Sequence, residues 1–382
     1  MRIGIITILK VNNYGAELQA YATQAVLHRL GHDAEIIDYL FYKNPEHEAT
    51  ELSKPVFKFG WKKRIAEWLY PKLEKLKTGK NSEYQRRRTE RFEQFHRTNT
   101  RMSRTYKTVD DLYMNASDYD IYMTGSDQVW NPGIYSSLEP YLLTFAPKGK
   151  KRITYASSFG VSKLPEKCVP FYAERLKCMD TIGVREEQAV QLVKEVSGKK
   201  AEWVLDPTLL LNAADWRKIA EKTDVPEGGY ILLYELTPCP YIKKLALHLS
   251  GLLKGKTIVR ICKQAVREDE EADIINITDA GPAEFLYLFS KASMVITNSF
   301  HGTAFSINFQ RTFYTVLPLR KQNNSRQRSL LKLFGLTDRL LVEGDSFPEA
   351  TELMIDYTSV DNILVRERAK SIHFLEESVN GK

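Results

Sequence analysis

A histidine flanked by small polar residues follows a short apolar run in the second half of the chain. Met294–Ile296 is apolar enough for a buried strand, the next residues are polar, and an apolar helical pattern resumes from Ala304. His301 therefore stands between a strand and a helix start, where ligands bind in open α/β sheets. Free amides of a new helix favour an anion, and a histidine can move a proton near neutral pH. A lone histidine more often caps or packs, but this context favours a chemical role.

Two other predicted strands also end in polar side chains. The strand over Asp120–Met123 leads through a glycine and a serine into Asp127. Its carboxylate can act as a general base, bind a sugar hydroxyl, or merely cap the following turn. The strand over Thr181–Val184 runs into Arg185 at a strand-to-helix junction, which is a poor position for a simple surface charge and a good one for an anion.

The elements that must position these residues follow a βαβ pattern from the start of the chain. Strand Arg2–Thr7, helix Ala16–Leu30 and strand Ala34–Tyr39 predict a parallel, doubly wound sheet. Later apolar runs predict further strands at residues 153–156, 230–234, 257–261, 274–277 and 312–316. We therefore expect an α/β fold of two Rossmann-like domains facing across a cleft.

The predicted domains have the following limits. The first covers residues 1–211 and contains a basic helical insertion at about residues 45–110. The second covers residues 212–354, and residues 355–382 form a helix that packs back on the first domain. A chain of 382 residues with 43% hydrophobic content suits two domains with full cores.

Composition also narrows the classes of function. No apolar run reaches the roughly 18 residues of a membrane span, and the first residues lack the pattern of a signal peptide. The four cysteines form no C-x-x-C pair and have no histidine at ligand spacing, so we expect reduced thiols, no structural zinc and no metal site. A cytoplasmic protein is predicted.

One segment makes the protein basic. Between Lys54 and Lys107 there are 17 Lys or Arg against 5 Glu, a balance of +12, whereas the whole chain carries +7. Four residues of its first part, Trp61, Lys62, Lys63 and Trp68, mix tryptophan and lysine at helical spacing, as at an anionic membrane surface. A helix that covers the core with a solvated basic face explains them equally well. No nucleic-acid motif accompanies the arginines at 86–88, so nucleic acid is not expected.

Six blocks in register resemble the polysaccharide pyruvyl transferase family. They are Asn13–Gln19, Gly125–Trp130, Val184–Glu186, Leu205–Thr208, Thr297–Thr303 and Asn324–Arg326. Members of this family are two-domain proteins of the GT-B type from bacterial capsule and exopolysaccharide biosynthesis. The resemblance implies transfer of the enolpyruvyl group of phosphoenolpyruvate onto two hydroxyls of a sugar, which gives a cyclic ketal and phosphate. It implies no cofactor beyond this donor substrate.

The resemblance also suggests roles for individual residues. His301 is the expected general acid, and Asp127 of the first, acceptor domain is expected to hold or deprotonate a hydroxyl. The residues expected to bind phosphoenolpyruvate are Arg185, Ser299, Gly302, Thr303, Lys321 and Arg326. Those expected to bind the acceptor are Asn13, Tyr14, Gly15 and Gln128. A sugar on a polyprenyl diphosphate carrier would bring the Trp- and Lys-rich helix to the inner leaflet, as a peripheral contact.

The chain departs from the family pattern at one position. Other branches carry an arginine two residues before the histidine, where this chain has Ser299. One cation is therefore missing, and Lys321, Arg326 and Arg328 remain open as its replacement.

Two other functions fit the same sequence. The first is a nucleotide-sugar glycosyltransferase, although the pair of glutamates eight residues apart that retaining enzymes often use is absent from the second domain. The second is an anion-binding protein without turnover. The acceptor sugar, the position and stereochemistry of the ketal, and the oligomeric state are not determined by the sequence.

Overall fold

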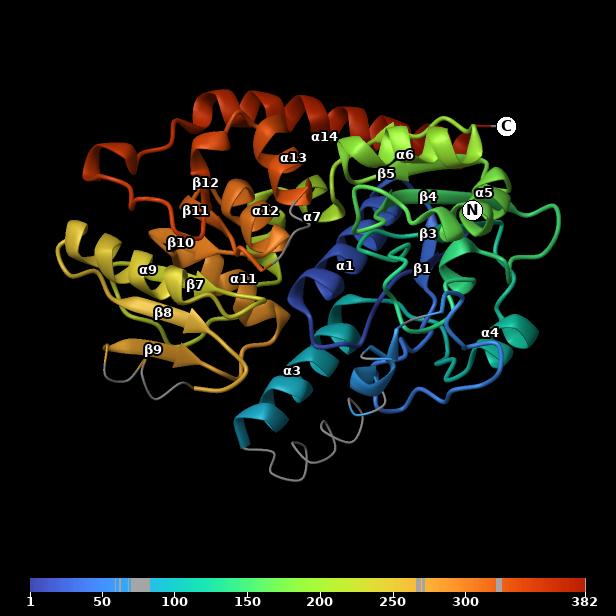
Figure 1. Cartoon of the computed structure of the whole chain (residues 1–382), viewed down its shortest axis with the longest axis horizontal. Coiled ribbons are helices and arrows are strands. Elements are labelled where there is room, and N and C mark those ends of the chain that lie inside the picture. The colour runs from blue at the N-terminus through green and yellow to red at the C-terminus, as the bar shows by residue number, and fades with distance from the viewer. Residues whose placement is uncertain are drawn as a thin grey trace. The chain divides into compact units, whose positions relative to one another are not determined.

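Two six-stranded parallel sheets organise the chain, as the computed structural model shows (Figure 1). The structure describes residues 1–58, 60–61, 63–67, 69, 83–265, 269, 272–320 and 325–381. The first sheet has the order β2-β1-β3-β4-β5-β6 and the second β12-β11-β10-β7-β8-β9, and every neighbouring pair is parallel. The prediction of a parallel α/β fold with two Rossmann-like sheets is confirmed.

The strands have these bounds: β1 Arg2–Ile6, β2 Asp33–Ile36, β3 Ile121–Thr124, β4 Lys151–Ser157, β5 Thr181–Val184 and β6 Glu202–Trp203 in the first sheet, and β7 Ile231–Tyr234, β8 Ile258–Ile261, β9 Ile274–Ile277, β10 Met294–Thr297, β11 Thr312–Leu317 and β12 Leu340–Val342 in the second. The sequence predicted ten of them and missed the short edge strands β6 and β12. Neither contains an apolar run long enough to stand out from a loop.

The chain forms two compact units, one around each sheet. Unit 1 contains residues Met1–Ser82, His96–Leu210 and Ala369–Lys382, and unit 2 contains Glu83–Phe95 and Leu211–Arg368. Two helices, α3 Glu83–Asn99 and α14 Tyr357–Asn380, therefore contribute residues to both units. The sequence placed the whole segment 45–110 with the first domain, but residues 83–95 group with the second unit.

Buried contacts explain this division of α3. In unit 2, Arg91 pairs with Asp279 (Nη1 to Oδ1, 3.3 Å) and with Glu284 (Nε to Oε1, 3.1 Å). In unit 1, the ring of His96 lies 3.1 Å from the buried carboxylate of Glu17. Acidic side chains therefore pair with α3 in both units.

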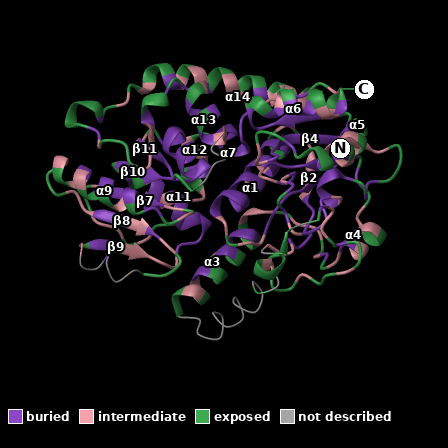
Figure 2. Ribbon diagram, viewed as in Figure 1, coloured by how far each residue is buried: buried purple, intermediate pink, exposed green. Residues whose placement is uncertain are grey.

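The remaining helices have the following bounds: α1 Tyr14–Arg29, α4 Val109–Asn115, α5 Val169–Lys177, α6 Glu187–Ser197 and α7 Pro207–Leu210 in unit 1, and α8 Ala213–Lys218, α9 Pro240–Leu252, α11 Pro282–Lys291, α12 Phe300–Asn308 and α13 Ser325–Leu333 in unit 2. Figure 2 shows α1 as almost wholly buried, and it packs against β2 and α7. Its small and apolar side chains allow this close packing, and Gly31 (φ 82°) follows its end.

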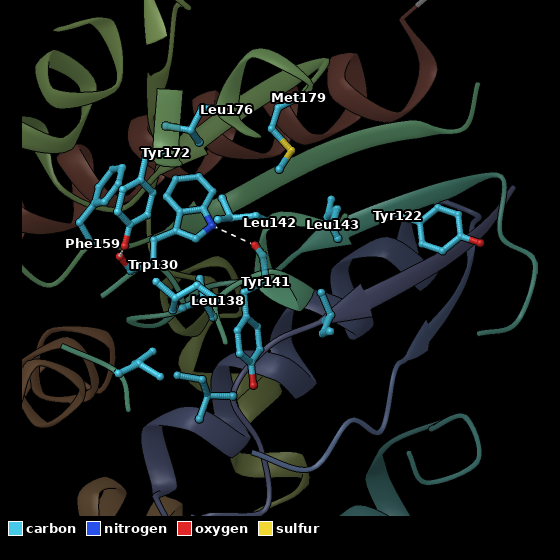
Figure 3. Packing of buried hydrophobic residues seen from close by; sticks show 14 of the residues in the cluster. Tyr122, Trp130, Leu138, Tyr141, Leu142, Leu143, Phe159, Tyr172, Leu176 and Met179 are labelled. Atoms are coloured by element: carbon cyan, nitrogen blue, oxygen red, sulfur yellow. Dashed lines mark hydrogen bonds between the residues drawn. The ribbon is translucent and has the colours of Figure 1, made fainter. Parts of the chain in front are cut away.

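The core of unit 1 is rich in aromatic side chains (Figure 3). Trp130 is fully buried and donates from its indole nitrogen to the Tyr141 carbonyl at 2.9 Å. Tyr172 donates to the Trp130 carbonyl at 2.6 Å. Because these bonds anchor Trp130, they also fix the loop between β3 and Trp130, which carries Asp127. One core cluster of unit 2 is mainly aliphatic and contains Ile231, Leu233, Leu245 and Ile296. Unit 2 also has buried aromatic side chains in mutual contact, among them Trp216, Phe285 and Phe305.

Candidate functional site

Asp127 and His301 occupy equivalent places in the two units. In unit 1 the strand order reverses between β1 and β3, and in unit 2 it reverses between β7 and β10. Asp127 follows β3, and His301 follows β10 in the first turn of α12. In open parallel sheets, ligands bind beyond the carboxyl ends of the strands at such reversal points. The topology alone therefore selects these two loops.

The backbone of Asp127 is strained. Its φ is 74°, in the left-handed region that is uncommon for residues other than glycine, although aspartate adopts it more often than most. The Asp127 carbonyl accepts a hydrogen bond from the Ser158 amide (3.0 Å), and the Trp130 amide donates to the Ser158 carbonyl (3.1 Å). The loops after β3 and β4 thus continue the pairing of their strands and hold Asp127 in this conformation. Strain of this kind is concentrated at functional sites.

Arg185, at the end of β5, lies in a buried cluster of three carboxylates. Its guanidinium nitrogens are 3.0 Å from Asp206 Oδ2, 3.4 Å from Glu186 Oε1 and 3.6 Å from Asp127 Oδ1. The side chain of Arg185 is 1% exposed. Burial by itself would lower the pKa of Arg185, but the carboxylates of Asp206, Glu186 and Asp127 raise it above its ordinary value. The guanidinium therefore stays charged.

The predicted role of Arg185 fits this environment poorly. Three carboxylates around one guanidinium leave an excess of negative charge, which repels a phosphoenolpyruvate trianion. The sequence identified Arg185 as a cation at a strand end, but it gave no site role to Glu186 or Asp206. Glu186 comes two residues after the predicted strand Thr181–Val184, and this position was the available signal for it. Asp206 follows the edge strand β6, which was not predicted.

Ser126 and Ser158 complete this cluster with hydroxyl groups, and neither was predicted to be a site residue. Ser126 donates within the cluster to Asp206 Oδ2 at 2.9 Å, and Ser158 donates to Glu186 Oε1 at 2.6 Å. Thr208 adds two bonds to Asp206 Oδ1, from its amide (3.0 Å) and its hydroxyl (2.7 Å). A buried carboxylate requires hydrogen bonds to both of its oxygens, and Asp206 has them.

The predicted acceptor residues surround the loop after β1 and the loop after β3. Asn13 caps α1 by accepting from the Gly15 amide at 3.1 Å, and Tyr14 is buried. Gln128 accepts from Asn131 Nδ2 at 2.8 Å. This pair lies against Gly160, where an added Cβ would come within 2.2 Å of Gln128 Oε1. Asn13 and Gln128 therefore have structural bonds in addition to any contact with a sugar.

The start of α12, which contains His301, is rich in hydroxyl groups. Ser299 is the N-cap of α12 and accepts from the Gly302 amide at 3.2 Å. Thr303 shares a hydrogen bond with Thr315 at 2.7 Å and donates to the Ser299 carbonyl at 3.1 Å. The His301 ring is buried and packs edge-on against Phe300.

One expectation about this loop needs correction. The amides of Gly302 and Thr303 were expected to be free for a phosphate, but they donate to the Ser299 hydroxyl (3.2 Å) and the Ser299 carbonyl (3.0 Å). An N-cap serine has this effect, because its oxygens satisfy amides of the first helical turn. Gly302 has a packing role as well, since a Cβ there would lie 2.3 Å from Thr297 Oγ1.

Asn298 fixes the His301 loop to the loop after β7. Its Oδ1 accepts from the Leu236 amide (2.8 Å), and its Nδ2 donates to the Thr237 carbonyl (2.7 Å). The Gln327 side chain donates to the Asn298 carbonyl at 3.3 Å. Arg326 is the neighbour of Gln327 in α13 and is half-buried, so a cation stands one residue from this contact. Lys321 lies outside the described residues.

The predicted membrane-contact residues are only partly described. Lys62 and Trp68 lie outside the described residues. Trp61 is 67% exposed and Ile65, four residues later, is 48% exposed. Lys63 donates to the Gly133 carbonyl in unit 1, and burial lowers its pKa. This lysine therefore has a local partner in the protein.

Two features are absent from the described part of the chain. Its residues contain no group of three or more His, Cys, Asp or Glu side chains arranged to hold a metal ion. None of its helices is long and apolar enough to cross a membrane.

Comparison with protein families gives one match. The family described as polysaccharide pyruvyl transferase matches residues 13–317, a range that includes Asp127, Arg185 and His301. A comparison with curated protein sequences gives no significant match.

Solved structures share the fold at low sequence identity. UDP-GlcNAc 2-epimerase from Neisseria meningitidis, bound to UDP-GlcNAc, is 8% identical with a TM-score of 0.50, over 100% of both chains. A protein described as a UDP-N-acetylglucosamine 2-epimerase from Listeria monocytogenes is 10% identical with a TM-score of 0.52, over 100% of this chain and 97% of the other. At this identity the likeness concerns the fold, which is GT-B-like.

Proposed function

The chain belongs to the polysaccharide pyruvyl transferase family, and from this premise we propose that it transfers the enolpyruvyl group of phosphoenolpyruvate onto two hydroxyls of a sugar. The products are a cyclic pyruvate ketal and phosphate. The observation that carries this proposal is the family match over residues 13–317, which includes β2 to β11 and the loops that carry Asp127 and His301. Family membership points to a transferase of polysaccharide biosynthesis.

In the proposed reaction, His301 donates a proton to the methylene carbon of phosphoenolpyruvate, and the adjacent C2 becomes oxocarbenium-like. The first sugar hydroxyl attacks C2, and its proton passes to Asp127. The C2–O bond to phosphate then breaks, and the second hydroxyl forms the second C–O bond at C2. One of the two hydroxyl protons replaces the proton that His301 delivered to the methyl group. The other leaves with phosphate.

The contrast between the two loops supports this division of roles. The hydrogen bonds of Ser299, Gly302 and Thr303 join hydroxyl, amide and carbonyl groups, so this loop suits an anionic donor better than the acidic cluster does. Ser299 accepts from Gly302 and keeps its own proton to donate to a phosphate oxygen. Arg326 and Lys321 are the proposed cations for the donor.

The acidic cluster suits a neutral acceptor. Asp127 is 13% exposed, whereas the Asp206 side chain is completely buried. A carboxylate with an accessible edge can accept a hydrogen bond from a sugar hydroxyl and then its proton. Asn13, Tyr14, Gly15 and Gln128 are the proposed surroundings of that sugar, on the loops after β1 and β3.

The test is phosphate release from phosphoenolpyruvate with a panel of polyprenyl-diphosphate-linked sugars, carried out in D₂O. The proposal expects one solvent deuterium in the methyl group of the ketal, because that carbon is protonated during the reaction. The variant His301→Asn should release phosphate about 10²–10⁴-fold more slowly, the usual contribution of a general acid. A ketal without solvent deuterium would contradict the assigned chemistry.

A nucleotide-sugar enzyme on the same fold is the second candidate, since the Neisseria structure holds UDP-GlcNAc. A thermal-shift comparison separates the two, because a ligand that binds the folded state raises its stability. The proposal expects a higher Tm with phosphoenolpyruvate and no change with UDP-GlcNAc. The reverse result would favour the nucleotide-sugar candidate, and no shift with either would favour a protein without turnover.

We also propose that the segment around Trp61 contacts an anionic inner leaflet, which would bring a lipid-linked acceptor close. Trp61 and Ile65 share one side of a helical turn, and the basic segment supplies the complementary charge. Co-sedimentation with phosphatidylglycerol vesicles should fall in Trp61→Ala plus Ile65→Ala. Met354→Ala is the matched control, because Met354 is 81% exposed elsewhere. Equal binding by both variants would contradict the contact.

A further inference from the structure

The three carboxylates around Arg185 are not equivalent. Asp206 is completely buried, and both of its oxygens are occupied: Oδ1 by the amide and hydroxyl of Thr208, and Oδ2 by Ser126 and Arg185. Nothing is left on Asp206 for a substrate. Its bonds hold one edge of the guanidinium in a fixed orientation.

Glu186 is the second fixed acid. Its Oε1 accepts from the Ser158 hydroxyl at 2.6 Å and lies 3.4 Å from Arg185 Nε. The side chain of Glu186 is buried as well. Two acids therefore orient the guanidinium from two sides, and this leaves its Nη2 facing the third.

That third acid is Asp127, whose Oδ1 lies 3.6 Å from Arg185 Nη2. Asp127 has the most exposed side chain of the three acids and is the one with a left-handed backbone. Ser158 connects the two ends of this arrangement: its amide donates to the Asp127 carbonyl, and its hydroxyl donates to Glu186. Ser158 thus fixes the backbone of Asp127. It also fixes Glu186, one of the two acids that orient Arg185.

We propose that Arg185 is a positioning residue for Asp127 and does not bind phosphoenolpyruvate. This inference rests on the proposed function and changes the role that the family resemblance suggested for Arg185. The guanidinium orients the carboxylate of Asp127 and leaves its exposed edge available to the acceptor. As the acceptor oxygen bonds to C2 of the enolpyruvyl group, its O–H bond breaks and the proton moves to Asp127.

Burial and charge separate this role from donor binding. A side chain that is 1% exposed cannot reach a ligand without moving, and Asp206 and Glu186 hold it in place. A trianion in contact with Arg185 would also lie among three carboxylates, which raises its energy. A neutral hydroxyl beside Asp127 needs no movement of Arg185 and is not repelled by the carboxylates.

The test measures donor affinity and turnover separately, in the full chain. The variants are Arg185→Lys, which keeps the charge but loses the planar fork, and Asp127→Asn, with Asp118→Asn as a control because Asp118 is exposed before the amino end of β3. All should bind phosphoenolpyruvate by calorimetry within about twofold of the wild type. Phosphate release should fall about 10²–10⁴-fold in Asp127→Asn and at least about tenfold in Arg185→Lys.

A rescue experiment distinguishes positioning from a general structural role. Glycine accepts the left-handed backbone at residue 127, so Asp127→Gly keeps the loop and removes the carboxylate. Added formate should restore part of the phosphate release in Asp127→Gly. It should restore none when Arg185→Lys is also present, because the guanidinium that orients the carboxylate is gone.

The outcomes that overturn the inference differ from those that overturn the function. A tenfold loss of phosphoenolpyruvate affinity in Arg185→Lys, with turnover of the bound donor unchanged, would return Arg185 to the donor site. Formate rescue that is equal with and without Arg185 would also overturn the positioning role. Failure of the wild type to bind phosphoenolpyruvate would instead overturn the proposed function itself, and this inference with it.

Discussion

The loops after β3 and β10 occupy the same topological position in two similar sheets, yet they are built from different chemistry. The Asp127 loop in unit 1 combines a strained backbone with a buried cluster of one cation and three acids. The His301 loop in unit 2 is a helix start capped by Ser299, with hydroxyls and amides as its polar groups. One fold thus provides two rigid positions with opposite preferences for charge.

This difference indicates how the fold can accept two unlike substrates. An excess of carboxylate favours neutral hydroxyls and the removal of their protons, whereas the amino end of a helix tolerates an anion. The two loops also differ in what stabilises them. The first depends on charge compensation in a buried place, and the second on close packing and capping. Substitutions in the two loops should therefore lower the stability of the protein for different physical reasons.

The largest effect is expected from Arg185→Ala. Removal of the guanidinium leaves Asp206 and Glu186 as buried carboxylates without a countercharge, which should lower the free energy of unfolding by about 3–5 kcal/mol. Chemical denaturation followed by tryptophan fluorescence measures this change. Arg320→Ala, at an exposed arginine after β11, is the control and should change stability by less than about 0.5 kcal/mol. Similar values for the two variants would show that the cluster does not depend on charge compensation.

A smaller loss is expected from Gly302→Ala in unit 2. The added methyl group would meet the buried side chain of Thr297, whose hydroxyl is bonded to the Tyr234 carbonyl at 2.6 Å. Overpacking of this kind should destabilise the protein by about 1–3 kcal/mol. The control is Gly251→Ala in α9, where a Cβ would have nothing within 4 Å. If Gly302→Ala is as stable as this control, close packing does not define the His301 loop.

The helix caps should give nearly equal effects in the two units. Ser299 caps α12 and Asn13 caps α1, each through a side-chain oxygen that accepts a backbone amide. Ser299→Ala and Asn13→Ala should each cost about 1 kcal/mol in thermal or denaturant unfolding. A much larger cost for one of them would reveal a further role of that cap.

The smallest effect concerns the strain at Asp127 itself. Asp127→Gly and Asp127→Ala both remove the carboxylate, but only glycine adopts a φ of 74° without penalty. The glycine variant should therefore be more stable than the alanine variant by about 1 kcal/mol, measured by the midpoint of unfolding. Equal stability would mean that the loop relaxes when the side chain changes.

Much of the fold could be predicted because its central strands are continuous apolar runs. Met294–Ile296 is of this kind and leads into the loop that carries His301. The edge strands β6 and β12 have two and three residues, and no periodicity distinguishes such short segments from loops.

The surroundings of the site residues could not be predicted in the same way. Arg185 was recognisable as a cation after a strand, but Ser126 stands 59 residues before it and Asp206 21 residues after it. Which acids neutralise a buried arginine depends on the order of the strands in the sheet, which composition does not encode. Ser299 illustrates the same limit. Its oxygens accept from the amides of Gly302 and Thr303, which were predicted to be free for a ligand.

The most direct test of the central claim is calorimetric titration of the wild type, His301→Asn and Arg185→Lys with phosphoenolpyruvate, and of the wild type with UDP-GlcNAc. The account predicts that phosphoenolpyruvate binds all three proteins within about twofold, because His301 acts in chemistry and Arg185 positions Asp127. It predicts no binding of UDP-GlcNAc. Binding of UDP-GlcNAc by a wild type that does not bind phosphoenolpyruvate would contradict the account.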